Sequence, residues 1–159
     1  MRKLLTTIIS SVLLLMSSNV FAAWTITASI TTAVMYSDNS KLYEITLNCV
    51  SDGSDPAAFK ISDCLVSTSE SIYQLYGGYI YEIVTDPGTE PDNTWNVTFS
   101  NKAGATLLSL TGLSTTATEY HKGSKDKGQY PLFDGDLTVD INDIGSNNDS
   151  VAIVIKIQK

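Results

Sequence analysis

Few residues of this chain are of types that commonly act in catalysis, and their spacing matches no known catalytic motif. His121 is the single histidine among 159 residues, and it lies in a polar, lysine-bearing stretch where we expect a solvated side chain. Ser-His-Asp catalysis needs a nucleophilic serine, but no G-x-S-x-G motif occurs. The chain also lacks a phosphate-binding G-x-x-x-x-G-K-[ST] loop and a dinucleotide fingerprint. We therefore expect no nucleophilic or nucleotide-dependent enzyme.

Carboxylates are the more open case, because four lie close together in sequence: Glu82, Asp86, Glu90 and Asp92. A glycoside hydrolase holds two carboxylates across a cleft, and spacing along a chain does not show a cleft. Calcium takes about six to eight oxygens, which such a loop can supply, so Asp86, Glu90 and Asp92 are candidate calcium ligands. Aspartate is also an ordinary turn residue. We expect no enzyme and no required cofactor, and keep calcium as a hypothesis.

Two other loops have a similar composition and are weaker calcium candidates. They contain Asp52 and Asp55 in one, and Asp140, Asn142, Asp143 and Asp149 in the other. None of the three loops has the spacing of an EF-hand.

Cys49 and Cys64 are the only cysteines. If the chain is exported, they can oxidise, and closing a loop of about 15 residues would stabilise the fold by roughly 3 kcal/mol in relaxed geometry. The alternative is a pair of buried free thiols. Together with His121 they offer too few soft ligands for a metal site. For an exported chain the sequence favours a Cys49–Cys64 disulfide.

Tyrosines cluster around the stretch YGGYIYEIVTDPGTEPDN, residues 76–93. A tyrosine surface can stack on sugars or bind a protein, because tyrosine buries area while keeping a polar tip. The alternative is packing between the strands of a sheet. Alternation predicts a strand over 79–85 with Tyr79, Tyr81 and Ile83 on one face, which favours packing for both tyrosines. Tyr73 and Tyr76 stay open to either interpretation.

The elements that must position these side chains are short alternating segments between turn residues. Val, Ile, Thr and Tyr dominate them, which is typical of β-strands. We expect about seven to nine strands, and therefore an all-β domain: a single antiparallel β-sandwich, with a small β-barrel as the alternative. Residues 114–129 are polar and predict a long loop. The main predicted strands are residues 24–30, 41–50, 79–85, 94–100, 105–113, 137–143 and 150–158.

The first residues predict a leader and not part of the fold. Arg2 and Lys3 precede an apolar run from Leu4 to Met16, and Val20 and Ala22 suit cleavage after Ala22. A membrane anchor is the alternative, but the run is shorter than the roughly 20 residues that a spanning helix needs. We expect a signal peptide at 1–22, one domain at 23–159, and export to the periplasm or the medium.

Charge narrows the classes of partner. The whole chain has a net charge of −7, and loss of the leader removes two of its basic residues. Such a surface repels nucleic-acid phosphates and anionic lipid. We therefore expect no nucleic-acid binding and no membrane association after cleavage.

Several segments carry a resemblance to known proteins: AWTITAS, YIYEIVTDPG, the TEPDN loop, WNVTFSNKAGATLL, LSTTATEYH and YPLFDGDLTVDI. Through them the chain resembles small proteins encoded among the structural genes of tailed phages and prophages. The resemblance covers most of residues 23–159. It implies a non-enzymatic, virion-associated β-sandwich, and it implies no particular functional residue. A leader departs from this pattern, since phage head and tail proteins assemble in the cytoplasm.

The expected function is thus structural or interactive, through protein partners or self-assembly. The alternative is an exported module that binds carbohydrate or a cell surface, with or without calcium.

Overall fold

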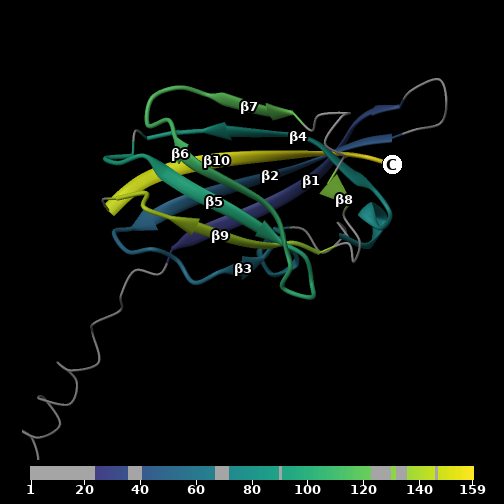
Figure 1. Cartoon of the computed structure of the whole chain (residues 1–159), viewed down its shortest axis with the longest axis horizontal. Helices are drawn as coiled ribbons and strands as arrows, with labels where there is room; N and C mark the ends of the chain where they lie inside the picture. The colour runs from purple at the N-terminus through teal and green to yellow at the C-terminus, as the bar shows by residue number, and fades with distance from the viewer. Residues whose placement is uncertain are drawn as a thin grey trace, which may run out of the picture.

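The computed structural model describes residues 24–35, 41–66, 72–89, 91–122, 130–131, 136–145 and 147–159. Its strands form two antiparallel sheets that pack face to face (Figure 1). In the larger sheet the order is β1-β2-β10-β4-β7, with β8 also paired to β4; in the smaller it is β3-β9-β5-β6. The strands are β1 Thr25–Met35, β2 Lys41–Asp52, β3 Phe59–Lys60, β4 Tyr79–Asp86, β5 Trp95–Ser100, β6 Thr106–Leu113, β7 Glu119–Lys122, β8 Tyr130–Pro131, β9 Thr138–Asn142 and β10 Asn147–Gln158.

This architecture confirms the predicted antiparallel β-sandwich, and the described strands form two open sheets in place of the alternative barrel. Two short 3-10 helices, η1 Ile61–Cys64 and η2 Ile72–Leu75, lie between β3 and β4. A tight turn follows β5. Gly104 takes φ +82°, and the Ala105 carbonyl accepts the amide of Asn101 at 2.9 Å.

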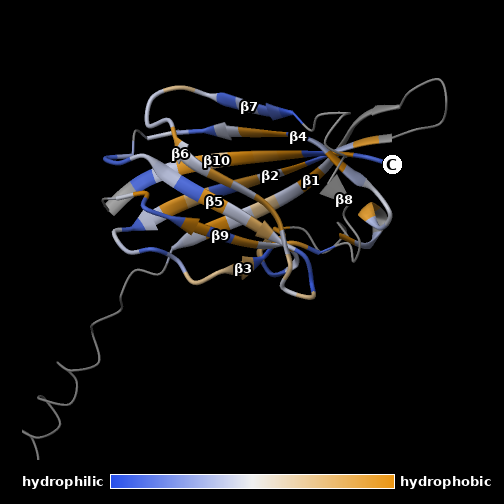
Figure 2. Ribbon diagram, viewed as in Figure 1, coloured by the Kyte–Doolittle hydropathy of each residue, from blue (hydrophilic) through white to orange (hydrophobic). Residues whose placement is uncertain are grey.

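The core lies between the sheets and is built from alternate residues of each strand. In β10 the inward residues Val151, Ile153, Ile155 and Ile157 are almost fully buried. In β2 the inward set is Tyr43, Ile45, Leu47 and Cys49. The smaller sheet contributes Trp95, Val97 and Phe99, so the two inner faces interdigitate as in other aligned sandwiches. Figure 2 shows this pattern as orange along β2, β10 and β5.

β10 occupies the centre of the larger sheet although it is the last strand in the chain. It pairs with β2 on one side, where Ile155 lies opposite Ile45, and with β4 on the other, where it lies opposite Ile83. The predicted C-terminal strand is therefore also the element that joins β1 and β2 to β4 and β7.

One predicted loop is in part a strand. Residues 114–129 were expected to form a loop, but β7 lies inside this range and pairs with β4 from Glu82 to Thr85. Backbone pairing with β4 places this segment in a strand despite its polar composition. A local sequence pattern cannot reveal such a distant pairing partner.

The predicted signal peptide, residues 1–22, lies outside the described residues. Within the described part of the chain, no helix has the length and apolar character needed to cross a membrane.

Candidate functional site

A β-bulge in β4 decides where its tyrosines point. Ile83 lies opposite Ile155 and Ile80 lies opposite Ile157, so β4 has one residue more than β10 between these pairs. The extra residue shifts the alternation, and Ile83 is fully buried while Tyr79 and Tyr81 remain 46% and 42% exposed. The prediction that Tyr79, Tyr81 and Ile83 share a face was therefore wrong. A period-two pattern cannot register an inserted residue that only the partner strand defines.

Tyr73 and Tyr76 come from η2 and the turn after it. Their rings meet edge to face, with centroids 5.2 Å apart, which is a favourable arrangement for aromatic quadrupoles. The following glycines form the entry to β4. Gly77 has φ +77°, and a Cβ on Gly78 would lie 2.6 Å from Cγ2 of Ile157, so this turn packs directly on the end of β10.

The same two tyrosines line a cavity of about 220 Å³ with Lys60, Lys102 and Asp136. Ser62 donates its hydroxyl to Asp136 at 2.8 Å and its amide to the same carboxylate at 3.3 Å. Within the described part of the chain, neither lysine has a carboxylate at ion-pair distance. The cavity thus carries two lysines and one carboxylate, none of them in an ion pair with another described residue.

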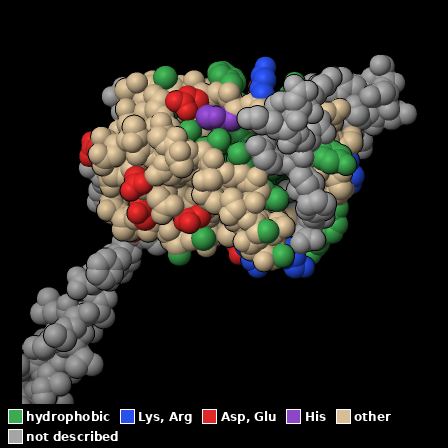
Figure 3. Space-filling model, in the orientation of Figure 1, with side chains coloured by type: hydrophobic (Ala, Val, Ile, Leu, Met, Phe, Trp, Pro, Cys, Tyr) green, Lys and Arg blue, Asp and Glu red, His purple; other side chains and the backbone are tan. Residues whose placement is uncertain are grey.

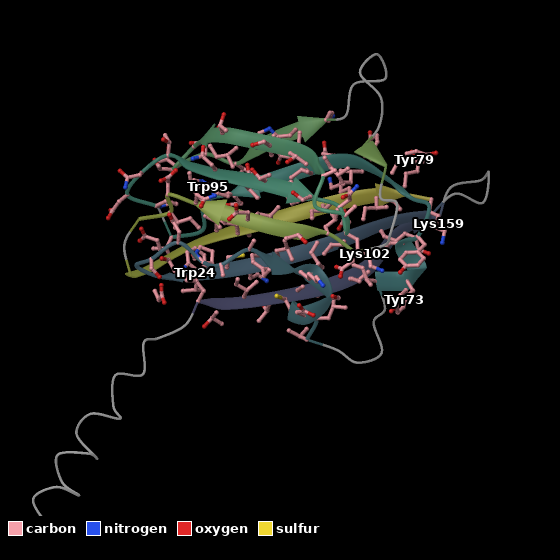
Figure 4. All side chains as sticks on the ribbon, turned by 60° about the horizontal axis from the view of Figure 1, so that its bottom comes forward. Trp24, Tyr73, Tyr79, Trp95, Lys102 and Lys159 are labelled. Carbon is pink, nitrogen blue, oxygen red and sulfur yellow. The ribbon has the colours of Figure 1, made fainter. Side chains whose placement is uncertain are left out.

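The four predicted tyrosines lie toward one end of the sandwich. Figure 4 places Tyr73 and Tyr79 at this end, with Lys102 and Lys159. All four are exposed, Tyr73 most of all at 68%. We call Tyr73, Tyr76, Tyr79 and Tyr81 the tyrosine cluster. Tyr120, the other strongly exposed tyrosine of the described residues, lies apart from it on β7.

The outer face of the larger sheet carries a row of alternating charges that the sequence analysis did not foresee. Glu44, Lys156, Glu82 and Lys122 are successive cross-strand neighbours on β2, β10, β4 and β7. Lys156 Nζ donates to Glu82 Oε2 at 2.6 Å, and Lys122 Nζ lies 3.8 Å from Oε1. The hydrogen bond to Glu82 is the main reason that the pKa of Lys156 is raised. A carboxylate so engaged is poorly suited to general acid catalysis.

The predicted calcium ligands are not gathered by the described residues. Asp86 ends β4 and accepts a hydrogen bond from Thr118 at 3.1 Å. The Asp92 amide donates to Asp149 Oδ2 at 3.3 Å. Glu90 lies outside the described residues. No group of three or more His, Cys, Asp or Glu side chains suited to a metal occurs in the described ranges, so calcium in this loop stays a hypothesis.

Aspartates of the two weaker calcium candidates accept hydrogen bonds, mostly from other loop residues. Asp52 accepts the hydroxyl of Ser54 at 2.6 Å, and these hydrogen bonds lower its pKa. Asp55 accepts the amide of Asp143 at 2.8 Å, and Asp143 itself accepts from the Asn96 side chain. These carboxylates satisfy backbone and side-chain donors, as turn residues often do. Asp140 and Asn142 lie on β9.

A second cavity, of about 310 Å³, lies beside this loop. It is lined by Trp24 and Ile26 from the start of β1, and by Asp52, Ser54, Asp55, Pro56 and Ala57. The indole N–H of Trp24 donates to the carbonyl of Ser54. The result is an aromatic recess with two carboxylates, Asp52 and Asp55, at its rim.

His121 is not the solvated loop residue that was expected. It lies on β7 with its side chain 23% exposed, 3.2 Å from the Thr85 hydroxyl and 3.6 Å from Glu119. Its place in a strand follows from the pairing of β7 with β4.

Cys49 and Cys64 are free thiols in the structure. Cys49 faces the core from β2, opposite Ile26 of β1. Cys64 is followed by Leu65, which bridges Ala28 on the opposite edge of β1. The two thiols are not bonded, although Cys64 is near enough to contribute, after burial, to the raised pKa of Cys49. The favoured disulfide does not form here, and burial raises the pKa of Cys49 to about 12.

The fold and these sites define the class only broadly, as an all-β sandwich with an aromatic end. No protein-family model matches the chain, and no curated protein matches it. One similar solved structure is an exo-1,3/1,4-β-glucanase from a Pseudoalteromonas species. The likeness has a TM-score of 0.28 and 12% identity, and covers 84% of this chain but 15% of the glucanase. A likeness this weak carries no argument about activity.

Proposed function

We propose that this chain is a non-enzymatic interaction protein that works through protein contacts, as the resemblance to small phage virion-associated proteins implies. The observation that carries the proposal is the tyrosine cluster. Tyrosine is enriched in the cores of protein interfaces, because it buries a large rigid area and keeps a hydroxyl for hydrogen bonding. Four exposed tyrosines at one end of a small domain are more than solubility requires.

The position of the cluster supports an interface. Tyr73 and Tyr76 pack edge to face, which restricts their rotamers before any partner arrives. Gly78 lies directly against Ile157 of β10, which anchors the turn between Tyr76 and Tyr79. Preorganised aromatic groups lose less entropy on binding.

The experiment compares particles with free protein. Phage particles and the secreted fraction of the producing cells are purified, and peptides of this chain are quantified in each by mass spectrometry. We expect the chain to copurify with particles, and we expect the double variant Tyr73→Ser, Tyr76→Ser to reduce the particle-bound share. Tyr120→Ser is the matched control, since it removes an exposed tyrosine outside the cluster. Recovery of the wild-type chain only as a free exported species would reject the virion role.

A second candidate is an exported module for carbohydrate or a cell surface. The cavity lined by Tyr73, Tyr76, Lys60 and Lys102 favours it, because ring faces and cationic donors are typical of sugar sites. A glycan array with and without calcium tests this candidate. Binding that survives Tyr120→Ser but not Tyr73→Ser would support it, and the absence of binding under both conditions would remove it.

A further inference from the structure

Charge is distributed unevenly along the long axis of the domain. Toward one end, where β2, β4 and β9 finish, lie carboxylates that we call the acidic end: Asp52, Asp55, Asp86, Asp92, Glu119, Asp143 and Asp149. Toward the other, where β10 finishes, lie Lys60, Lys102, Lys122, Lys156 and Lys159, which we call the lysine end. Fewer carboxylates lie among these lysines: Glu44, Glu82 and Asp136. Figure 3 shows most of the visible acidic side chains on the left and the visible lysines from the centre to the right.

Each end has a cavity. The charged side chains that line one cavity are mainly lysines, and those that line the other are aspartates. The acidic end has the recess formed by Trp24, Asp52 and Asp55. The lysine end has the cavity with Lys60 and Lys102 beside Tyr73 and Tyr76. Figure 4 shows Trp24 and Lys102 well separated along the domain, so one copy cannot close the two cavities on each other.

Lys60 and Lys102 form no ion pair with a described carboxylate, so both are available to bind a partner. Lys122 and Lys156 are engaged by Glu82. Asp136 also lies in the lysine cavity, so the two lysines exceed its carboxylate by one charge. At the acidic end the hydrogen bonds from Ser54 lower the pKa of Asp52, so its carboxylate stays ionised.

We propose that copies of this chain associate head to tail, with Lys60 and Lys102 of one copy docked on the recess of Trp24, Asp52 and Asp55 of the next. The inference rests on the proposed function and names a second copy as its partner. An indole attracts a lysine ammonium, and its flat face packs against the lysine methylenes. Because the two surfaces differ, the contact is heterologous, and every dimer keeps one unused surface of each kind.

Two double variants test the geometry. The lysine-end variant is Lys60→Gln with Lys102→Gln, and the acidic-end variant is Asp52→Asn with Asp55→Asn. The amides keep the capping acceptors for Ser54 and Asp143 and remove only the charge. Each protein is purified from cells that express the full 159-residue chain. Sedimentation velocity then follows association against protein concentration at 0.15 M and 1 M NaCl, ionic strengths with Debye lengths of about 8 Å and 3 Å.

We expect the wild-type protein to form oligomers larger than dimers at 0.15 M NaCl and to dissociate at 1 M. Each double variant alone should weaken self-association by at least about tenfold. An equimolar mixture of the two should form 1:1 dimers and nothing larger, because only one intact surface of each kind remains. The controls are Lys122→Gln and Asp63→Asn, each of which removes one charge of the corresponding sign outside the two cavities, and both should associate as the wild type does.

Three results would overturn the proposal: a monomer at all concentrations, a mixture that stays monomeric, or a variant that dimerises with itself as strongly as the wild type. The last would indicate a symmetric interface. Failure here is distinguishable from failure of the proposed function, since a chain that never self-associates can still copurify with phage particles.

Discussion

At the scale of single residues, Glu82 stands out because a charged side chain only 7% exposed must have compensating partners. Lys156 supplies a short hydrogen bond, and the better-exposed Lys122 adds a longer contact. The same face also holds Glu44 beside Lys156. The two ion pairs therefore link the three strands β10, β4 and β7 through side chains as well as through the backbone.

We predict unequal effects for its two lysines. Lys156→Met leaves Glu82 without its close donor and should lower the free energy of unfolding by about 2–3 kcal/mol. Lys122→Met removes a contact from a side chain that is 68% exposed, and should cost less than about 1 kcal/mol. Urea denaturation of both variants checks this difference, and equal losses would contradict it.

The cysteines give a second prediction at this scale. Protein denatured without reductant and treated with a maleimide should gain two labels by intact mass, because neither thiol is bonded. In the native protein at pH 8, Cys49 should stay unlabelled, since it is fully buried and its pKa is raised to about 12. No label on the denatured chain would establish a disulfide after all.

The raised pKa of Cys49 also predicts a pH dependence of stability. The folded state holds the neutral thiol, so this contribution is complete below the unfolded pKa near 9 and is lost as pH rises toward 12. Relative to Cys49→Ala, the wild type should lose on the order of 4 kcal/mol across that window. Urea midpoints at pH 8, 9.5 and 11 measure it, and parallel pH profiles for the two proteins would count against it.

At the scale of elements, the bulge in β4 allows both Ile80 and Ile83 to face the core. Ile80 and Ile83 must both face the core, although an odd spacing places them on opposite faces of a regular strand. The additional residue restores the inward position and turns Tyr79 and Tyr81 outward. The exposure of Tyr79 and Tyr81 thus depends on a backbone irregularity.

Deletions in β4 test this role. Removing Tyr81 should restore regular alternation between Ile80 and Ile83, and the protein should remain folded with its two-state transition. Removing Val84 should turn Ile80 and Ile83 away from the core, because a one-residue slip reverses every side chain before it. Near-ultraviolet circular dichroism and urea unfolding distinguish the two, and a stable Val84 deletion would show that β4 does not set its register this way.

At the scale of the whole molecule, the sandwich is completed by its last strand. β10 is bonded to β2 and to β4, so the larger sheet has no continuous backbone ladder without it. Its inward isoleucines also fill the middle of the core. The domain can reach its native packing only after the C-terminal residues are present.

Truncation provides the corresponding prediction. A chain that ends at Ser146 should show no cooperative unfolding transition, and an excess of a peptide of residues 147–159 should restore one. Deleting Lys159 alone is the control, since this exposed terminal residue lies beyond β10. A cooperative transition in the chain that lacks β10 would show that the other strands fold independently.

The sequence by itself determined the class of fold and most inward faces. Alternation is a local property of a strand, so Tyr43 to Cys49 and Val151 to Ile157 could be assigned to the core before any partner was known. The turn at Gly104 was equally local. The tyrosine cluster was also visible as a group, although the faces of its members were not.

Only the tertiary structure decided which strands are neighbours, and hence the sites that depend on register. Glu82 meets Lys156 because β10 lies beside β4, and the bulge at Tyr81 exists only relative to β10. Segregation of charge into two ends likewise follows from the directions in which the strands run. Pairing between distant strands is selected by burial of the whole core, and no local sequence pattern encodes that choice.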